Sequence, residues 1–203
     1  MAYLLGRYNN LTVWWLMIHY FTNRELSQKL EINLARWKRW SRAFLPPDPL
    51  GGHQSGYARQ YSTKDAFLVY LAGFLVSTLG FSIPAARQIL HDLTPWLNKN
   101  IIENGTWAAN QNGDAAVGPR CIDLIIMPAR RKVTPAFTYR IRSRIERKTL
   151  EAGETTLWQE QFTEQVIKPG EPLTAGCYPA CARWVDLSAI AEHFFAQLTP
   201  KES

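Results

Sequence analysis

Helix start and stop signals follow one another closely between residues 22 and 49. Thr22 and Glu25 have the spacing of a capping box, in which the Thr side chain accepts a hydrogen bond from a backbone N–H and the Glu side chain reaches back. Asn33 suits the N-cap of a second helix over residues 34–44, and the prolines after it end that helix because proline cannot continue the hydrogen-bond ladder. The spacing therefore predicts two short helices joined by a tight corner.

The second of these helices is apolar on one side and basic on the other. We expect its apolar side chains to face a core; they are Leu34, Trp37, Phe44 and Leu45. A basic outer face on a helix that a partner helix braces is the arrangement that enters the major groove of DNA. We therefore expect DNA contacts from its charged residues, which are Arg36, Lys38, Arg39 and Arg42.

A glycine-rich loop over residues 48–56 and a short strand over residues 57–61 come next. Ser62 and Asp65 form another capping box, which predicts a long apolar helix to about Leu79. These signals extend the helical pair by a hairpin-like loop and a third helix.

Gly80 is placed to end the third helix in a left-handed conformation, and Ser82 caps a fourth helix that is expected to run to about Leu90. Thr94 and Pro95 predict the start of one more helix, to about Glu103.

Beyond residue 103 the pattern changes from helical to extended. Residues 104–118 are small and polar and predict a linker, whereas residues 121–128, 137–146 and 155–167 have the patterns of strands. Asp186 is expected to cap a last helix, to about residue 198. The predicted fold class is α+β, with an extension over 1–20, a helical domain over 21–103, a linker over 104–118 and a β-rich domain with a C-terminal helix over 119–203.

Three fragments occur in a fixed order along residues 21–91: Trp37-Lys38-Arg39-Trp40-Ser41 before Leu45 and Pro46, then Arg59-Gln60-Tyr61-Ser62, then Leu79-Gly80-Phe81-Ser82-Ile83. In order and spacing this region, about a third of the chain, resembles the winged helix-turn-helix domain of the MerR family. The resemblance implies a bacterial-type, cytoplasmic protein that binds double-stranded DNA and regulates transcription.

The resemblance also implies which residues contact DNA. On or near the recognition helix it implies Asn33, Arg36, Lys38, Arg39 and Trp40, and in the wing Arg59, with Tyr61 in a structural role. From their positions we expect Asn33 and Arg36 to read base edges, and Arg39 and Arg42 to bind phosphates. The competing interpretation is a solvated basic helix face, or a winged helix that binds protein.

The chain departs from the family after residue 91. The classical family continues with a long coiled-coil helix that forms the dimer, but Pro95 and residues 104–118 allow only a short helix here. A homodimer is therefore expected to form, if at all, through the β-rich part. The promoter-untwisting mechanism of the family needs the two-fold dimer, so we do not extend it to this chain.

Charge is sorted into blocks along the chain. Residues 24–64 carry a net charge of +5, residues 130–148 of +7 and residues 149–203 of −5. The second block contains an alternating stripe of Arg140, Arg142 and Arg144. This stripe fits a second DNA contact, a site for an anionic ligand, or the partner of the acidic C-terminal block; we favour pairing or solvation.

The remaining features point away from an enzyme or a membrane protein. The sequence contains no paired-carboxylate, nucleophile or phosphate-loop motif, and we expect no cofactor. Cys121, Cys177 and Cys181 fit a reducing cytoplasm; a soft-metal or thiol-sensor site is possible chemically, but small inert cysteines are favoured. The apolar run over residues 11–21 has about half the length of a spanning helix, and Met17 is a candidate natural start.

Two other functions fit the same module. The chain fits an architectural, segregation or recombination-directing DNA-binding protein, and it fits a protein-interaction adaptor with a MerR-like fold. The sequence specifies neither the operator nor an effector.

Overall fold

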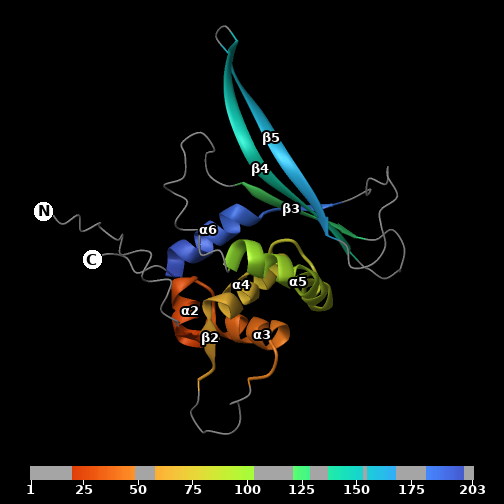
Figure 1. Cartoon of the computed structure of the whole chain (residues 1–203). Helices are drawn as coiled ribbons and strands as arrows, with labels where there is room; N and C mark the ends of the chain where they lie inside the picture. Colours follow the sequence, from red (N-terminus) through yellow and green to blue (C-terminus); the bar gives the residue numbers. More distant parts are fainter. Residues whose placement is uncertain are drawn as a thin grey trace, which may run out of the picture.

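The computed structural model describes residues 20–48, 58–102, 121–128, 137–152, 155–167 and 182–198. Helices and an antiparallel sheet are both present, so the predicted α+β class is confirmed. In Figure 1 the sheet lies above a layer of helices, and α3 lies on the side of that layer away from the sheet. The elements, in order, are β1 (Tyr20–Thr22), α2 (Asn23–Lys29), α3 (Leu34–Phe44), β2 (Gln60–Ser62), α4 (Thr63–Ser77), α5 (Ile83–Leu97), the π-helix η1 (Asn98–Ile102), β3 (Ile122–Pro128), β4 (Phe137–Ala152), β5 (Thr155–Ile167), β6 (Arg183–Asp186) and α6 (Leu187–Leu198).

The predicted helix caps of α2 and α3 are confirmed. The Thr22 hydroxyl accepts a hydrogen bond from the backbone N–H of Glu25 at 3.3 Å, and a carboxylate oxygen of Glu25 accepts one from the Thr22 N–H at 2.7 Å. The backbone bonds to Thr22 are the main reason that the pKa of Glu25 is lowered. Between the two helices Glu31 adopts a φ of 54°, a left-handed conformation that turns the chain sharply.

The α4 helix is buried on most of its surface and forms the centre of the helical layer. Ser62 caps it, as predicted, by accepting a hydrogen bond from the Asp65 N–H at 3.1 Å. Gly73 lies directly against the ring of Trp40 from α3, and a Cβ added at Gly73 would come within 2.3 Å of that ring. The α3 and α4 helices therefore pack more closely than any residue with a side chain would allow at this position.

The fourth helix, α5, differs from the prediction. Gly80 has the expected positive φ of 73° and Ser82 caps the helix, but α5 continues without a break through Pro95 to Leu97 and runs into η1. Proline removes one backbone donor, which falls on the exposed side of the helix. Burial of Leu93 and Leu97, both inaccessible to solvent, holds the helix together, so the predicted break after Leu90 is wrong.

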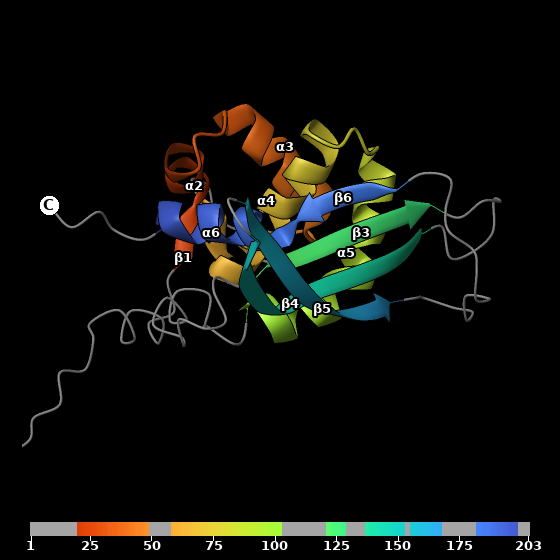
Figure 2. The same ribbon diagram turned by 90° about the horizontal axis from the view of Figure 1, so that it is seen from above.

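The four-stranded sheet has the order β5-β4-β3-β6 and is antiparallel throughout. The predicted strands over residues 121–128 and 155–167 are confirmed, and the third is longer than predicted because β4 continues to Ala152. β4 pairs with β3 as far as Ser143. The pairing of β4 with β5 has a register irregularity between Arg144 and Glu146. Beyond this irregularity the β4–β5 hairpin projects from the body (Figure 1). Figure 2 shows the helices on one face of the sheet only.

The helical half and the β-rich half share one hydrophobic core. Phe67 of α4 contacts Phe194 of α6 with ring centroids 5.2 Å apart, and the Tyr139 hydroxyl of β4 donates a 2.6 Å hydrogen bond to Asp92 of α5. The predicted boundary at residue 119 therefore does not separate two independent cores. The predicted linker over 104–118 lies outside the described residues.

None of the described helices is long and apolar enough to cross a membrane.

Candidate nucleic-acid interface

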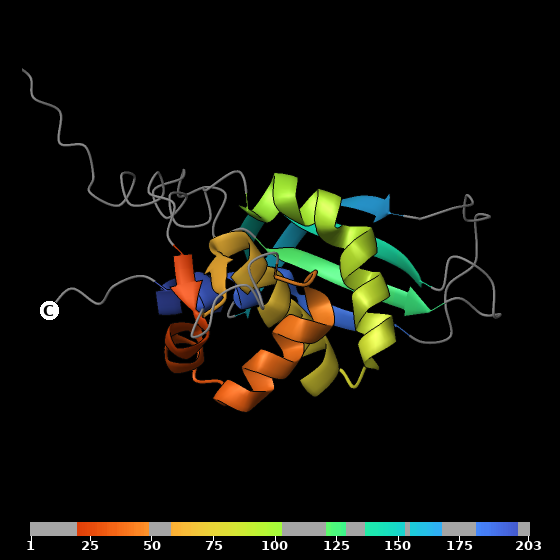
Figure 3. The same ribbon diagram turned by 90° about the horizontal axis from the view of Figure 1, so that it is seen from below.

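The α3 helix has one buried face and one exposed face, as its sequence predicts. Figure 3 shows it lying across the surface of the molecule on the side away from the sheet. Trp37 is inaccessible to solvent and packs edge-on against Tyr61, with ring centroids 5.8 Å apart. Apolar contacts from this face anchor the helix, so the orientation of its other face is fixed.

Trp40 belongs to the buried face as well. Its side chain is 5% exposed and its ring contacts Gly73 of α4. The expected DNA contact by Trp40 is therefore wrong, because a side chain enclosed between two helices cannot reach a groove. The physical reason is the helical repeat: Trp40 is three residues after Trp37 and lies on the same side of the helix.

The four basic residues of α3 are all exposed: Arg36, Lys38, Arg39 and Arg42. Among the described residues no ion pair involves any of them. The guanidinium of Arg42 lies along its own helix, since its Nε donates a 3.2 Å hydrogen bond to the carbonyl of Lys38. This face of α3 therefore carries positive charge that no carboxylate of the described chain neutralises.

Asn33 caps α3 rather than extending freely from it. Its Oδ1 accepts hydrogen bonds from the backbone N–H of Ala35 at 3.0 Å and of Arg36 at 3.3 Å. Its side-chain NH₂ group is left to donate, so a base contact by Asn33 is restricted to an acceptor on the base.

Tyr61 ties β2 to both helices. Its hydroxyl donates to Oδ1 of Asn23 at 2.7 Å and lies 3.0 Å from Oγ of Ser41, while its side chain is 1% exposed. This burial agrees with the structural role and leaves Tyr61 no surface for DNA. The expected DNA contact by Tyr61 is therefore wrong, and the residue positions α2 against α3 instead.

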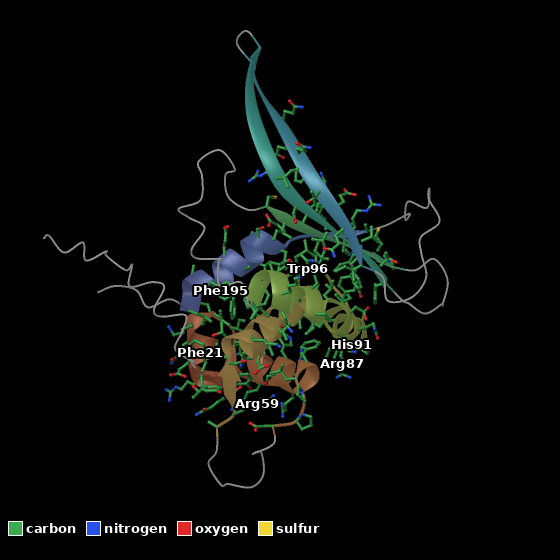
Figure 4. The ribbon with its side chains drawn as sticks, viewed as in Figure 1. Phe21, Arg59, Arg87, His91, Trp96 and Phe195 are labelled. Carbon is green, nitrogen blue, oxygen red and sulfur yellow. The ribbon has the colours of Figure 1, made fainter. Side chains whose placement is uncertain are left out.

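Arg59 precedes β2 on the same side of the molecule as α3 (Figure 4). Its guanidinium carbon lies 5.4 Å from the centroid of the Tyr61 ring, a cation–π distance, and its side chain is partly exposed. Most of the predicted glycine-rich loop over residues 48–56 lies outside the described residues, because the structure describes none of residues 49–57.

Arg87 of α5 is a residue of this region that sequence analysis missed. Figure 4 labels this side chain. Its Nε and one Nη donate hydrogen bonds of 3.0 and 2.8 Å to the carbonyl of Ala43, one of the last carbonyls of α3. A cation at a helix C-terminus stabilises the helix by pairing with its unsatisfied carbonyls. No local pattern predicts this contact, because the two residues are 44 positions apart.

The arginine stripe of β4 is paired, which confirms the interpretation favoured from the sequence. Glu164 of β5 lies 3.4 Å from both Arg140 and Arg142, and Glu160 lies 2.9 Å from Arg144. Arg142 also stacks on Phe162, with its guanidinium carbon 4.1 Å from the ring centroid. These contacts make the stripe a poor candidate for a phosphate site.

The described chain contains no group of three potential metal ligands. Cys121 is partly buried, and burial is the main reason that the pKa of its thiol is raised, which disfavours the reactive thiolate. Cys177 and Cys181 lie outside the described residues.

Comparison of the chain with protein-family models, curated proteins and solved structures found no match. The functional interpretation therefore rests on the geometry of α3 and its surroundings.

Proposed function

We propose that this chain is a cytoplasmic, sequence-specific double-stranded DNA-binding protein that regulates transcription, with α2 and α3 as a helix-turn-helix and α3 as the helix that enters the major groove. One observation carries the proposal: α3 buries both of its tryptophans and exposes all four of its basic side chains. A helix needs this division to be held by a protein on one face and to meet a polyanion on the other.

The contacts of individual side chains support a division of roles. Arg36 lies in the first turn of α3, where recognition helices contact base edges, and its guanidinium can bind a guanine through two hydrogen bonds. Arg42 lies in the last turn, and its bond to the Lys38 carbonyl keeps its guanidinium close to the helix. This position suits a phosphate contact.

Site selection with the purified protein and a random duplex library tests the proposal, followed by anisotropy titrations of a selected duplex from about 50 to 200 mM salt. We expect the logarithm of the association constant to fall linearly with the logarithm of the salt concentration, with a slope near −0.9 for each phosphate contact.

The other outcomes separate the alternatives. Salt-dependent binding with no enriched sequence would favour an architectural DNA-binding protein. Absent binding, or binding that does not respond to salt, would contradict phosphate contacts and favour the adaptor. An asymmetric selected site would contradict recognition by a symmetric dimer.

A further inference from the structure

The two edges of the sheet differ in length and in protection. β6 is an edge of four residues that begins with Arg183 and ends with Asp186, and short, charged edges resist pairing with other chains. β5 is an edge of thirteen residues without proline, lysine or arginine. In the part of the chain that the structure describes, β5 pairs with β4 alone, so its other backbone edge is open.

Two apolar side chains are exposed on the strand that forms this edge. Val166 is 45% exposed and Phe162 is partly exposed, whereas Ile167 packs against the core. A long strand edge with exposed apolar residues and no lysine or proline between Thr155 and Ile167 is a template for another strand; Lys168 and Pro169 follow and limit the pairing segment at Ile167. The edge over residues 162–167, next to the body of the sheet, is therefore the candidate interaction surface.

We propose that this edge pairs with β5 of a second copy of the chain, in antiparallel orientation, to form a continuous eight-stranded sheet. An antiparallel pair of identical strands has a two-fold axis perpendicular to the sheet, so one edge complements itself.

The charge on this edge permits self-pairing. Glu164 is the only charged residue of the segment, and Arg140 and Arg142 already neutralise it. An axis at Thr163 or Gln165 also keeps the two Glu164 side chains from lying directly opposite one another, which would be unfavourable.

The orientation of α3 favours this arrangement over stacking of the two sheets, an argument that rests on the proposed function. The sheet and α3 lie on opposite sides of the helical layer (Figure 1). A two-fold axis perpendicular to the sheet keeps both helical layers on one side, so that both α3 helices face the same duplex, as a palindromic site requires. Face-to-face stacking would direct them away from one another.

Cross-linking tests the pairing directly. With Cys121, Cys177 and Cys181 replaced by Ser, Thr163→Cys or Gln165→Cys is oxidised in the full-length protein, with Arg183→Cys on the opposite edge as the matched control. We expect a disulfide-linked dimer from one or both β5 positions at a yield at least tenfold above that of the control. Equal yields, or a higher yield from Arg183→Cys, would overturn the proposal.

Sedimentation velocity provides a second test. We expect the wild-type protein to dimerise and the double variant Thr163→Lys, Val166→Lys, at two exposed positions of the segment, to raise the dimer dissociation constant at least tenfold, because lysines on an edge repel their copies across the axis. Glu192→Lys with Ala196→Lys, on the exposed face of α6, adds charge elsewhere and should change little. A monomeric wild type, or a dimer that tolerates the β5 lysines, would contradict the proposal.

The two proposals can fail separately. A β5-linked dimer that binds no DNA would contradict the proposed function and leave the pairing intact. DNA binding by a protein that stays monomeric and does not cross-link through β5 would contradict the pairing and leave the proposed function intact.

Discussion

Two segments of this protein, α3 and β4, are rich in arginine, yet the structure gives them opposite surroundings. The basic residues of α3 are exposed and form no ion pair within the described chain. The side chains of Arg140 and Arg142 in β4 are 28% and 27% exposed and share one carboxylate, that of Glu164. A similar density of positive charge in the sequence therefore produces an exposed basic surface in one case and an ion-paired one in the other.

The difference arises from the neighbours of each segment. On its inner side α3 meets apolar residues of α4 and β2, which bury its tryptophans and leave its cations to solvent. β4 meets β5 in a register that places Arg142 directly opposite Glu164. Cross-strand pairing places the side chains of two strands directly beside one another, so opposite charges can pair, whereas the outer face of a surface helix has no facing element. A run of positive charge in the sequence therefore indicates a binding surface only when the element packed beside it is known.

The largest expected effect is the difference in stability between substitutions on the buried face and on the exposed face of α3. Trp37→Ala should lower the free energy of unfolding by about 3–5 kcal/mol, because it empties a fully buried site. Lys38→Ala, the adjacent exposed position, is the matched control and should change stability by no more than about 0.5 kcal/mol. Urea denaturation followed by circular dichroism measures both, and similar losses would show that α3 is not anchored as described.

The second prediction compares α3 with β4 in DNA binding. Arg36→Ala combined with Arg39→Ala should weaken binding of the selected duplex by about 30-fold or more, since each lost contact costs about 1–3 kcal/mol. Arg140→Ala combined with Arg142→Ala removes the same charge from the paired stripe and should change affinity by less than about threefold, since a screened, distant charge contributes little. Anisotropy titration at one salt concentration measures both variants. Equal losses would show that the stripe also binds DNA.

Breaking the ion pairs of Arg140 and Arg142 with Glu164 should have a smaller effect on stability and on DNA affinity. Glu164→Gln removes the carboxylate that Arg140 and Arg142 share. Because these groups are about one-third exposed, we expect the free energy of unfolding to fall by about 1 kcal/mol or less. Non-specific DNA affinity at low salt should rise slightly as the arginines become available. Thermal unfolding and titration with unrelated duplex measure the two changes, and a larger gain in affinity would show that Glu164 masks a second DNA site.

The smallest expected effect is on the pH dependence of stability and involves Asp123 of β3, which lies opposite Arg142 of β4. Burial raises the pKa of this carboxyl above its ordinary value of 3.8, although a 3.1 Å hydrogen bond from the Trp184 indole opposes the shift. The folded state therefore binds the proton more tightly than the unfolded state, and stability falls as the pH rises from 3.8 through the folded pKa.

Asp123→Asn should remove this dependence and keep the bond from Trp184. We expect the variant to be more stable than the wild type at pH 7, with the difference disappearing at a pH below 3.8, the ordinary pKa. Unfolding free energies across this pH range measure the difference, and a variant less stable at pH 7 would indicate that the ionised carboxylate is favourable in the fold.

Much of the fold was predictable because its signals are local. The caps formed by Thr22, Asn33 and Ser82 act within three residues, and the alternation of β4 needs only one strand. The break predicted before Pro95 was wrong, because the burial of Leu93 and Leu97 outweighs one missing backbone bond.

The candidate site was predictable in part for the same reason. The exposed cations of α3 follow from its helical repeat, but two expected contacts, Trp40 and Tyr61, are buried. Arg87 at the end of α3 gave no signal, because its contact with Ala43 exists only once α5 packs beside that helix.

The sequence by itself determined where the helices begin, which strands alternate and which side of α3 is basic, because these properties depend on residues within a few positions of one another. Only the tertiary structure decided that Trp40 fills the space left by Gly73, that Glu160 and Glu164 pair with the stripe of β4, and that β5 pairs with β4 alone among the described strands. These outcomes depend on which elements become neighbours, and burial of one shared core selects those neighbours across the whole chain.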